Sequence, residues 1–411
     1  MKILLLTNEY PNEAYPKPDS PWVLPYFARE WVKQGHEVMV VVNSTKFPRL
    51  YYSFARLVSS YFSKRFDITA SNLSDRTWSR PFSFVDNGVK VWNLPMLKFK
   101  PGGKFKESVI DKQVQNICSL LRENHFTPDV ITGHWVNPQL MLVSILGERL
   151  NCKTAFVFHS DYGQNVIRKF DIARRIQHID RIGCRSEYAA KEVKKLLGLT
   201  EMPFICYSGI PDRYIDHISA NTSLFEGRRK DITISCAARL VGYKNIGSII
   251  DAMAATKCNC SLRIAGEGPL KDSLLHQAQI LNLDKQVSFL GKISRKSLQE
   301  EMHQSMMFVL ISHHEVFGLV YLEAMLQGCI VVASRESGAD GIIRDGENGF
   351  LCESGNSAEL AKIIERVAEM PKDERRKLSE NAQKTARSFS DSKVAEMYLR
   401  NITLVAVQRM L

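Results

Sequence analysis

The sequence predicts an α/β protein with two domains, each built on a doubly wound parallel sheet covered by helices on both faces. Short all-apolar runs alternate with longer stretches in which apolar residues recur at helical spacing, and this alternation is typical of parallel strands joined by helices. The chain has 411 residues, which is too long for one typical domain. A turn-rich stretch near the middle, Ser208-Gly-Ile-Pro211, follows a strand-like run and marks the boundary.

The first half contains six short apolar runs and four longer helical patterns. The expected strands are Ile3–Leu6, Val38–Val42, Val130–Thr132, Thr154–Phe158, Arg181–Cys184 and Phe204–Tyr207. The expected helices are Pro25–Gln34, Ser108–Asn124, Gln139–Leu150 and Glu187–Leu197. We expect residues 1–207 to form the first domain, with ligands bound beyond the carboxyl ends of its strands.

The second half repeats the alternation. Its expected strands are Ile232–Ala237, Leu262–Ala265, Val287–Leu290, Met307–Ile311, Ile330–Ala333 and Gly349–Cys352. Its expected helices are Asn245–Ala255, Pro269–Leu281, Leu319–Gln327, Ser357–Met370 and Lys372–Arg387. We expect residues 208–388 to form the second domain. Residues 389–411 are expected to return to the first domain through a last helix, Lys393–Leu411.

The composition is that of a globular protein, with 45% hydrophobic and 24% charged residues. The opening apolar run, Ile3–Leu6, is shorter than the roughly seven residues of a secretory signal core. No apolar stretch approaches the ~18 residues that span a bilayer. The nine cysteines are scattered and include no Cys-x-x-Cys pair. We therefore expect reduced thiols, a cytoplasmic location and no metal site.

The net charge of +11 is concentrated in one part of the chain. The segment from Lys46 to Lys106 holds twelve Lys or Arg residues and three Asp. Within it, aromatic and aliphatic residues alternate with cations from Lys46 to Arg65, which predicts a helix lying on an anionic membrane. The alternative is a core-facing helix with a solvated basic face. No nucleic acid is expected as a partner, because no binding module accompanies the charge.

The most informative stretch runs from Glu315 to Glu323, with seven residues between the two carboxylates. It follows a buried strand and opens a helix, and Gly318 lies just before that helix. The unpaired backbone N–H groups of Gly318 and Leu319 would form an anion site, and the two glutamates would bind hydroxyls on either side of a diphosphate. The alternative is an acidic residue favoured by the helix dipole and an exposed glutamate.

Three further strand-to-helix turns lie at the same predicted edge of the second sheet. Arg239 and Lys244 follow its first strand, where two cations can neutralise a departing diphosphate without a metal. The Gly-rich turn that begins at Gly266 and the turn that ends at Ile293 follow the next two strands. In the first domain, His159 follows a buried strand. Each feature alone also fits a plain loop or a structural residue.

Together these features resemble the retaining glycosyltransferases of family 4, which have the GT-B fold. The resemblance covers nearly the whole chain, and the Glu315–Glu323 spacing is its most specific part. Supporting segments are Pro25–Gln34, Gly35-His-Glu-Val38, His134-Trp135, His159, Tyr207-Ser-Gly-Ile-Pro211, Arg239 to Lys244, Gly266-Glu-Gly-Pro269 and Asp345-Gly-Glu-Asn-Gly349.

The resemblance implies two Rossmann-like domains facing across a cleft, the first on the acceptor side and the second binding the donor. It implies transfer of a sugar, with retained configuration, from a UDP- or GDP-type nucleotide sugar to a glycan or lipid-linked acceptor, in surface polysaccharide, lipopolysaccharide or glycolipid synthesis. The cations and the backbone N–H groups would hold the diphosphate, Glu315 and His159 would contact the donor sugar, and Glu323 would contact the ribose. The implied catalytic residues are Glu315, His159, Arg239 and Lys244. The implied donor-binding residues are Arg239, Lys244, Gly266, Ile293, Glu315, Phe317, Gly318, Leu319 and Glu323.

The chain departs from the common pattern of this family at several turns. Family members often have a Gly-Gly loop where this chain has Pro16–Val23, an Asn-Gly where it has Ser208-Gly209, and a Lys-Gly where it has Lys244-Asn245. The usual Gly-Gly-x-Pro-Glu is replaced by Ser337-Gly-Ala-Asp-Gly341. The sequence has no Asp-x-Asp pair, so we expect sugar transfer without a metal ion.

Three rival functions share the alternating architecture. A nicotinamide-dependent oxidoreductase would need Gly-x-Gly-x-x-Gly after the first strand, and residues 5–16 contain no glycine. A sugar-nucleotide 2-epimerase of the same fold would need no acceptor. A non-catalytic sugar-nucleotide-binding protein would bind without turnover. The residues do not specify the base, the sugar, the acceptor or the oligomeric state.

Overall fold

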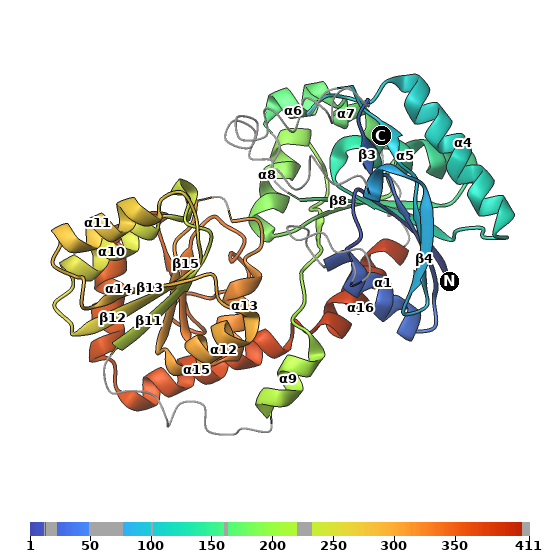
Figure 1. The fold of residues 1–411 in the computed structure, drawn as a ribbon. Helices are drawn as coiled ribbons and strands as arrows, with labels where there is room; N and C mark the ends of the chain where they lie inside the picture. The colour runs from blue at the N-terminus through green and yellow to red at the C-terminus, as the bar shows by residue number, and fades with distance from the viewer. Residues whose placement is uncertain are drawn as a thin grey trace. The chain divides into compact units, whose positions relative to one another are not determined.

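The computed structural model describes residues 1–11, 13, 23–48, 77–99, 102–159, 163–219, 232–313 and 315–404. The chain folds into two compact units (Figure 1). The N-terminal unit comprises Met1–Cys184, Ala190–Cys206 and Ala395–Leu411. The C-terminal unit comprises Arg185–Ala189 and Tyr207–Val394. Most of the basic segment from Lys46 to Arg65, the expected membrane helix, lies outside the described residues.

The N-terminal unit is built on an eight-stranded sheet in the order β10-β9-β8-β7-β1-β2-β5-β4. Its strands are β1 Lys2–Thr7, β2 Glu37–Val42, β4 Phe82–Asp86, β5 Val89–Asn93, β7 Val130–His134, β8 Lys153–Phe158, β9 Arg181–Cys184 and β10 Phe204–Ile205. β1 pairs in parallel with β2 and β7. The side chains of Ile3–Leu6 are fully buried, as expected for a central strand covered on both faces.

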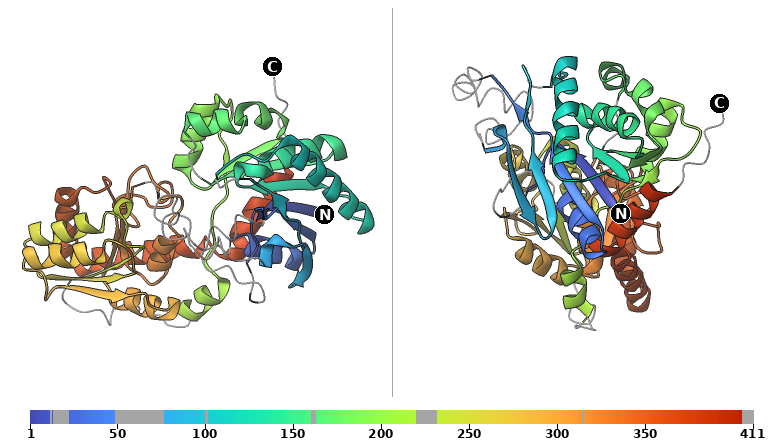
Figure 2. Two further views of the ribbon diagram at one scale, coloured as in Figure 1. Left: turned by 45° about the horizontal axis from the view of Figure 1, so that its top comes forward. Right: turned by 90° about the vertical axis from the view of Figure 1, so that its right-hand side faces the viewer.

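Helices cover both faces of this sheet (Figure 2). The helices of the N-terminal unit are α1 Val23–Lys33, α4 Glu107–Glu123, α5 Val136–Leu150, α6 Gln164–Lys169, α7 Ile172–Arg175, most of α8 Glu187–Leu197 and the later part of α16 Asp391–Thr403. A small second sheet pairs β3 Thr45–Lys46 with β6 Met96–Leu97. Short 3-10 turns lie at Thr77–Ser79 and Ile176–His178. α6 and α7 were not expected from the sequence.

The expectation of purely parallel strands is wrong at one edge of this sheet. β4 and β5 form an antiparallel hairpin, with Asp86 opposite Val89. The turn between them is Asn87-Gly88, and both residues have positive φ, 49° and 85°. Asn-Gly is the pair that a two-residue hairpin turn prefers, because both central residues of that turn need positive φ. The hairpin was therefore readable in the sequence.

The C-terminal unit has a six-stranded sheet, all parallel, in the order β13-β12-β11-β14-β15-β16. Its strands are β11 Ile232–Ala237, β12 Cys260–Ala265, β13 Val287–Gly291, β14 Met307–Leu310, β15 Ile330–Ser334 and β16 Phe350–Cys352. Its helices are α9 Asp212–Ser219, α10 Ile246–Ala255, α11 Lys271–Ile280, α12 Arg295–Gln304, α13 Leu319–Leu326, α14 Ser357–Glu369 and α15 Lys372–Arg387. A 3-10 turn, η3 Gly242–Lys244, precedes α10.

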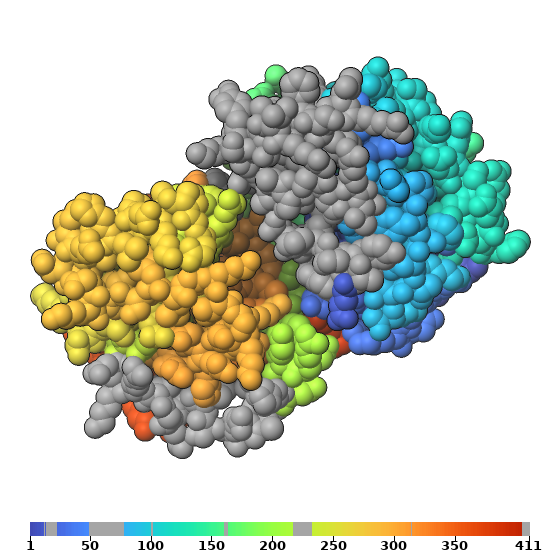
Figure 3. All heavy atoms as spheres, in the orientation of Figure 1, coloured from blue at the N-terminus to red at the C-terminus, as the bar shows by residue number. Residues whose placement is uncertain are grey.

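Apolar side chains from both faces of this sheet form one core, to which β14 and β15 contribute fully or almost fully buried residues. α11 lies on the outside and forms much of the yellow surface that faces the viewer in Figure 3. The sequence pattern missed α12, whose residues 295–301 include no apolar residue except Leu298. Its start is nevertheless marked, because the Ser294 side chain accepts a hydrogen bond from Ser297 N.

The last helix, α16, begins with residues of the C-terminal unit and continues into the N-terminal unit from Ala395. There the indole nitrogen of Trp31 donates a hydrogen bond of 2.9 Å to the carbonyl of Ala395. The ring of Tyr398 packs at 5.2 Å from the rings of both Phe27 and Trp31. α16 starts two residues before the expected Lys393, and residues 405–411 lie outside the described part of the chain.

Candidate active site

The expected site residues of the C-terminal unit lie in loops that follow neighbouring parallel strands. β11 pairs with β14, so their carboxyl ends lie at the same edge of the sheet. The loop after β11 carries Arg239 and Lys244, and the loop after β14 carries Glu315. A hydrogen bond of 2.7 Å from His313 N to Tyr243 O joins the two loops.

Lys244 and Glu315 form an ion pair between these loops, joining Nζ to Oε2. The side chains are only 14% and 17% exposed. The ammonium group also lies 5.2 Å from the centre of the Tyr243 ring. A pair withdrawn from water interacts more strongly than a solvated pair. The fold thus brings together two residues that are 71 positions apart in the chain and that were both expected at the site.

Gly318 directly precedes α13 and has φ 75° and ψ 57°. A Cβ atom at this position would lie 2.3 Å from the ring of Tyr321, so only glycine fits here. The Glu315 side chain lies next to this turn, because its Cγ would be 3.2 Å from a Cβ atom at Gly318. The Glu315 carbonyl accepts a hydrogen bond of 2.7 Å from Gly338 N. Phe317, 5% exposed, and half-buried Leu319 flank the glycine. An anion at this helix start would meet aligned N–H donors.

Glu323 lies within α13 and is only 7% exposed. Its Oε1 pairs with the guanidinium of Arg295, the first residue of α12. Burial raises the pKa of the Glu323 carboxyl, and the charge of Arg295 opposes that rise. The same guanidinium lies 5.5 Å from the centre of the Tyr214 ring. The expectation of an exposed glutamate, which was the alternative for this residue, is wrong.

Gly266 and the residues around it pack against the loop that carries Arg239. Gly266 has φ 139°, and a Cβ atom there would lie 1.9 Å from the carbonyl oxygen of Ala238. Leu240 N donates a hydrogen bond of 3.0 Å to Glu267 O. The glycine therefore lets the two loops lie in contact. Arg239 itself is exposed. Ile293 is half-buried and follows β13 by two residues.

The structure explains why Asn245 can replace the glycine that is usual in the family. Asn245 is in the left-handed region, with φ 52° and ψ 35°. Asparagine tolerates this conformation better than most residues do. Its side-chain amide donates to Ile311 O at 2.8 Å and to Ser354 Oγ at 3.0 Å. These bonds hold the end of the Lys244 loop on the strand edge.

His159 directly follows β8 in the N-terminal unit. Its Nε2 lies 2.9 Å from Nδ1 of the fully buried His134. The Trp135 indole stacks on the His159 ring, with the ring centres 4.3 Å apart and the planes inclined by 21°. The His159 ring is thus held at one edge by His134 and on one face by Trp135.

Sequence reasoning missed two arginines. Arg295 was hidden because α12 was not expected. Arg185 follows β9 and is only 4% exposed. Its guanidinium donates to Ser208 Oγ and lies 5.7 Å from the centre of the Phe317 ring, next to Gly318. The signal was present, because Arg185 follows a strand and precedes a helix just as Arg239 does.

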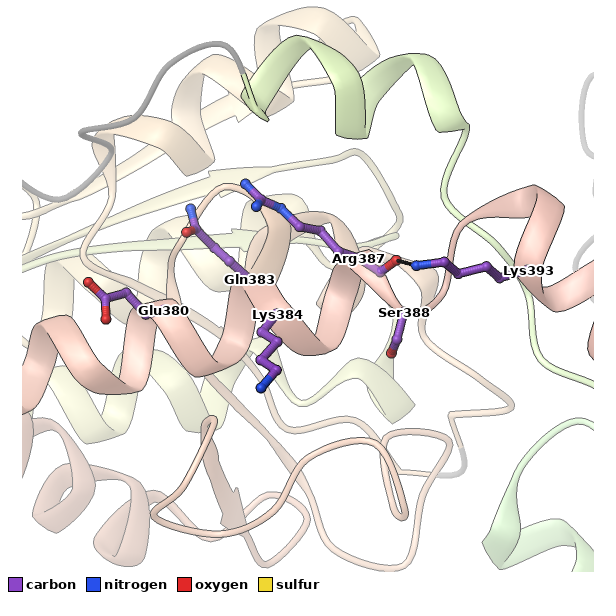
Figure 4. A pocket seen from close by; sticks show the side chains of 6 residues that line it. All are labelled: Glu380, Gln383, Lys384, Arg387, Ser388 and Lys393. Atoms are coloured by element: carbon purple, nitrogen blue, oxygen red, sulfur yellow. Dashed lines mark hydrogen bonds between the residues drawn. The ribbon is translucent and has the colours of Figure 1, made fainter.

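A shallow hollow of about 450 Å³ lies elsewhere, on α15 and the start of α16 (Figure 4). Its lining residues are Glu380, Gln383, Lys384, Arg387, Ser388 and Lys393. None of them was expected at the site. Within the described residues, no three His, Cys, Asp or Glu side chains are grouped so that they could hold a metal ion. Among all the helices that the structure describes, none is long and apolar enough to cross a membrane.

Comparison with known proteins identifies the fold. The solved structure of Anabaena Alr3699/HepE in complex with UDP is 19% identical, covers 98% of this chain and 100% of its own, and has a TM-score of 0.66. The architecture is thus the GT-B fold, with its two parallel-sheet domains. Residues 224–385 match the family model of glycosyl transferases group 1. The expected resemblance to glycosyltransferase family 4 is thereby confirmed.

Two curated relatives extend the comparison. The N-acetyl-alpha-D-glucosaminyl L-malate synthase of Bacillus anthracis is 25% identical over 290 residues, which are 66% of this chain and 73% of that protein. The N-acetylgalactosamine-N,N'-diacetylbacillosaminyl-diphospho-undecaprenol 4-alpha-N-acetylgalactosaminyltransferase of Campylobacter jejuni is 34% identical over 173 residues. That match covers 42% of this chain and 46% of the Campylobacter protein.

Proposed function

We propose that this protein transfers a sugar from a nucleotide diphosphate sugar to a glycan or lipid-linked acceptor, with retained configuration and without a metal ion. The observation that carries the proposal is the Lys244–Glu315 ion pair beside the N-terminal end of α13. It joins a cation for a diphosphate and a carboxylate for sugar hydroxyls at one strand edge.

The chemistry needs a site that stabilises the negative charge on the departing nucleoside diphosphate. Lys244 and Arg239 would supply the cations, and the backbone N–H groups of Phe317, Gly318 and Leu319 would supply aligned donors. Glu315 holds the Lys244 ammonium in place through their ion pair. With donor bound, Lys244 would contact the phosphates, while Glu315 accepts hydrogen bonds from the sugar.

Glu323 would bind the ribose hydroxyls of the donor. Its Oε1 pairs with Arg295, so the second carboxylate oxygen is the one we assign to the ribose. The charge of Arg295 opposes the rise that burial causes in the pKa of this carboxyl, and so favours the charged form, which accepts hydrogen bonds. Gly266 and Ile293 would line the same donor site.

The proposal gives the two units different roles. Residues 208–388 would bind the donor, and residues 1–207 would bind the acceptor and present His159 to the donor sugar. A UDP- or GDP-type donor is proposed, in keeping with the UDP complex of Alr3699/HepE. A lipid-linked acceptor is in keeping with the diphospho-undecaprenol in the name of the Campylobacter relative. Such an acceptor would place the enzyme on the cytoplasmic side of a membrane.

A thermal-shift screen of nucleotide sugars, followed by a transfer assay, tests the proposal. A donor that binds the folded protein raises its melting temperature by mass action. Consumption of that donor should then depend on an added acceptor. Isomerisation of the donor alone would establish an epimerase instead, and binding without turnover would establish a non-catalytic protein.

A further inference from the structure

A chain of hydrogen-bonded side chains lies at the carboxyl ends of β7 and β8 in the N-terminal unit. The Tyr398 hydroxyl lies 2.6 Å from Thr132 Oγ1 and 2.8 Å from His134 Nε2. His134 Nδ1 lies 2.9 Å from His159 Nε2. Three of these residues belong to adjacent strands or their ends, and the fourth comes from α16. The chain thus leads from the last helix of the protein to His159.

The inner part of this chain is closed to solvent. Thr132 and His134 are fully buried, and Tyr398 is only 1% exposed. The Tyr398 ring is surrounded by the rings of Phe27, Trp31 and Phe204, at centre distances of 5.2, 5.2 and 5.9 Å. Buried polar atoms depend on their protein partners for hydrogen bonds. The proton positions along the chain are therefore set by these partners rather than by bulk water.

Trp135 fixes the outer end of the chain. It has φ 63° and ψ 122°, a conformation that costs free energy in a residue other than glycine. This backbone conformation accompanies the stacking of the indole on His159 at 4.3 Å. Such strain persists where the surrounding structure enforces it, and it is concentrated at functional sites. His159 is therefore held in one orientation before any ligand arrives.

We propose that Tyr398 is a positioning residue that sets the tautomer of His159. Its hydroxyl donates to His134 Nε2, so His134 carries its proton on Nδ1 and donates it to Nε2 of His159. A neutral His159 then carries its own proton on Nδ1, and this nitrogen is a donor suited to an oxygen atom of the sugar. The inference rests on the proposed function, in which His159 contacts the donor sugar.

The direction of the hydrogen bonds made by Tyr398 follows from the chemistry of the groups. A phenol, with a pKa near 10, is a stronger hydrogen-bond donor than an aliphatic alcohol and a weaker acceptor. Tyr398 is therefore expected to donate to the imidazole and to accept from Thr132. In a neutral imidazole, the hydrogen bond at one nitrogen determines which nitrogen carries the proton. A histidine held in the wrong tautomer loses most of its catalytic value even when its position is kept.

Nitrogen NMR of the full-length protein, labelled with 15N-histidine and without ligand, tests the chain directly. In the native protein, Nδ1 of both His134 and His159 should carry the proton. Tyr398→Phe keeps the ring and its packing but removes the hydroxyl, so His134 should lose this tautomer preference and the His159 Nε2 signal should shift. Unchanged histidine signals in Tyr398→Phe would overturn the proposal.

Thr132→Val serves as a direction control. This change removes the hydroxyl that donates to Tyr398 but leaves the Tyr398 hydroxyl that donates to His134. Nδ1 of both His134 and His159 should therefore still carry the proton. If the hydrogen bonds point in the opposite direction, Tyr398 donates to Thr132 Oγ1. Thr132→Val then removes the last acceptor of the chain, and the tautomers of the two histidines should change. That second outcome would also overturn the proposal.

Kinetics then separate positioning from structure. Tyr398→Phe should lower kcat about tenfold and leave the KM for the donor within about twofold. Glu396→Gln, which changes an exposed residue of the same helix, should match the native enzyme. A changed tautomer with native kcat would overturn the positioning role. If the native protein transfers no sugar to any acceptor, the proposed function fails, while the NMR experiment still decides the direction of the chain.

Discussion

The proposed role of Lys244 can be tested by changing the residue to Met, which keeps much of the side-chain volume and removes the charge. Loss of a group that stabilises the leaving diphosphate should lower turnover about a hundredfold, or about 2.7 kcal/mol in transition-state stabilisation. The same change leaves the Glu315 carboxylate, 17% exposed, without its cation. A fully buried pair loses about 3–5 kcal/mol when one partner is removed, so we expect about 1–2 kcal/mol of destabilisation here.

A second substitution separates these two effects. Glu315→Gln in the Lys244→Met background removes the unpaired charge, so most of the lost free energy of unfolding should return. Turnover should stay low, because neither the cation nor the carboxylate is restored. Urea denaturation and kcat/KM for the donor measure the two quantities on the same samples.

Arg344→Met is the matched control. Arg344 pairs with Glu347 at the surface of the same unit, and both side chains are about two-thirds exposed. A solvated pair contributes about 0–1 kcal/mol, so stability and turnover should change little. Native kcat/KM in Lys244→Met, with the fold intact, would refute the assignment of Lys244 to the diphosphate.

Four other predictions follow from the site and the charge distribution. Activity should survive dialysis against EDTA, and loss with chelator followed by recovery with Mg²⁺ or Mn²⁺ would contradict metal-independent transfer. Calorimetry with the nucleoside diphosphate should show weaker binding for Glu323→Gln and nearly native affinity for Glu315→Gln, because ribose contacts exist in substrate and product alike; the opposite ranking would exchange the two roles. Because the folded-state pKa of Glu323 is raised, its carboxyl contributes stability below the unfolded pKa, and this contribution is lost as pH rises through the folded pKa. As pH rises between these two pKa values, the free energy of unfolding of Glu323→Gln should therefore increase relative to that of the native protein. A difference that does not change with pH would argue against a raised pKa for the buried carboxyl. Sedimentation with liposomes should increase with anionic lipid, fall with salt and fall when Arg49, Arg56, Lys64 and Arg65 are changed to Ser. Binding that is unaffected by all three changes would favour the alternative, a core-facing helix.

Alternation of apolar runs and helical patterns predicted most of the fold, because each central strand is buried on both faces and each helix on one. The elements that escaped prediction lack that contrast. α12 is mostly polar, and the solvent-facing strand β4 is only partly buried, with Val85 71% exposed. For β4, the turn at Asn87-Gly88 was the available signal.

The site was predictable in part. The position of Lys244 after one strand and of Glu315 after another placed both residues at strand ends. Lys244 and Glu315 can form an ion pair because β11 and β14 are neighbours in the sheet, although β12 and β13 lie between them in the sequence. Alternation alone does not specify strand order. For the same reason, neither the partner of Glu323 nor the link from Tyr398 to His134 was accessible from the sequence.

The crossing of α16 from one unit into the other also bears on how the chain folds during synthesis. Trp31 and Ala395 are 364 positions apart, yet they share a hydrogen bond within the N-terminal unit. The first 206 residues leave the ribosome long before the helix that covers Phe27 and Trp31 exists. Since domains fold as units while they emerge, the unit made first is the last to be completed. A nascent chain halted before residue 395 should therefore expose an apolar surface at α1 and recruit chaperones there until the C-terminal helix is released.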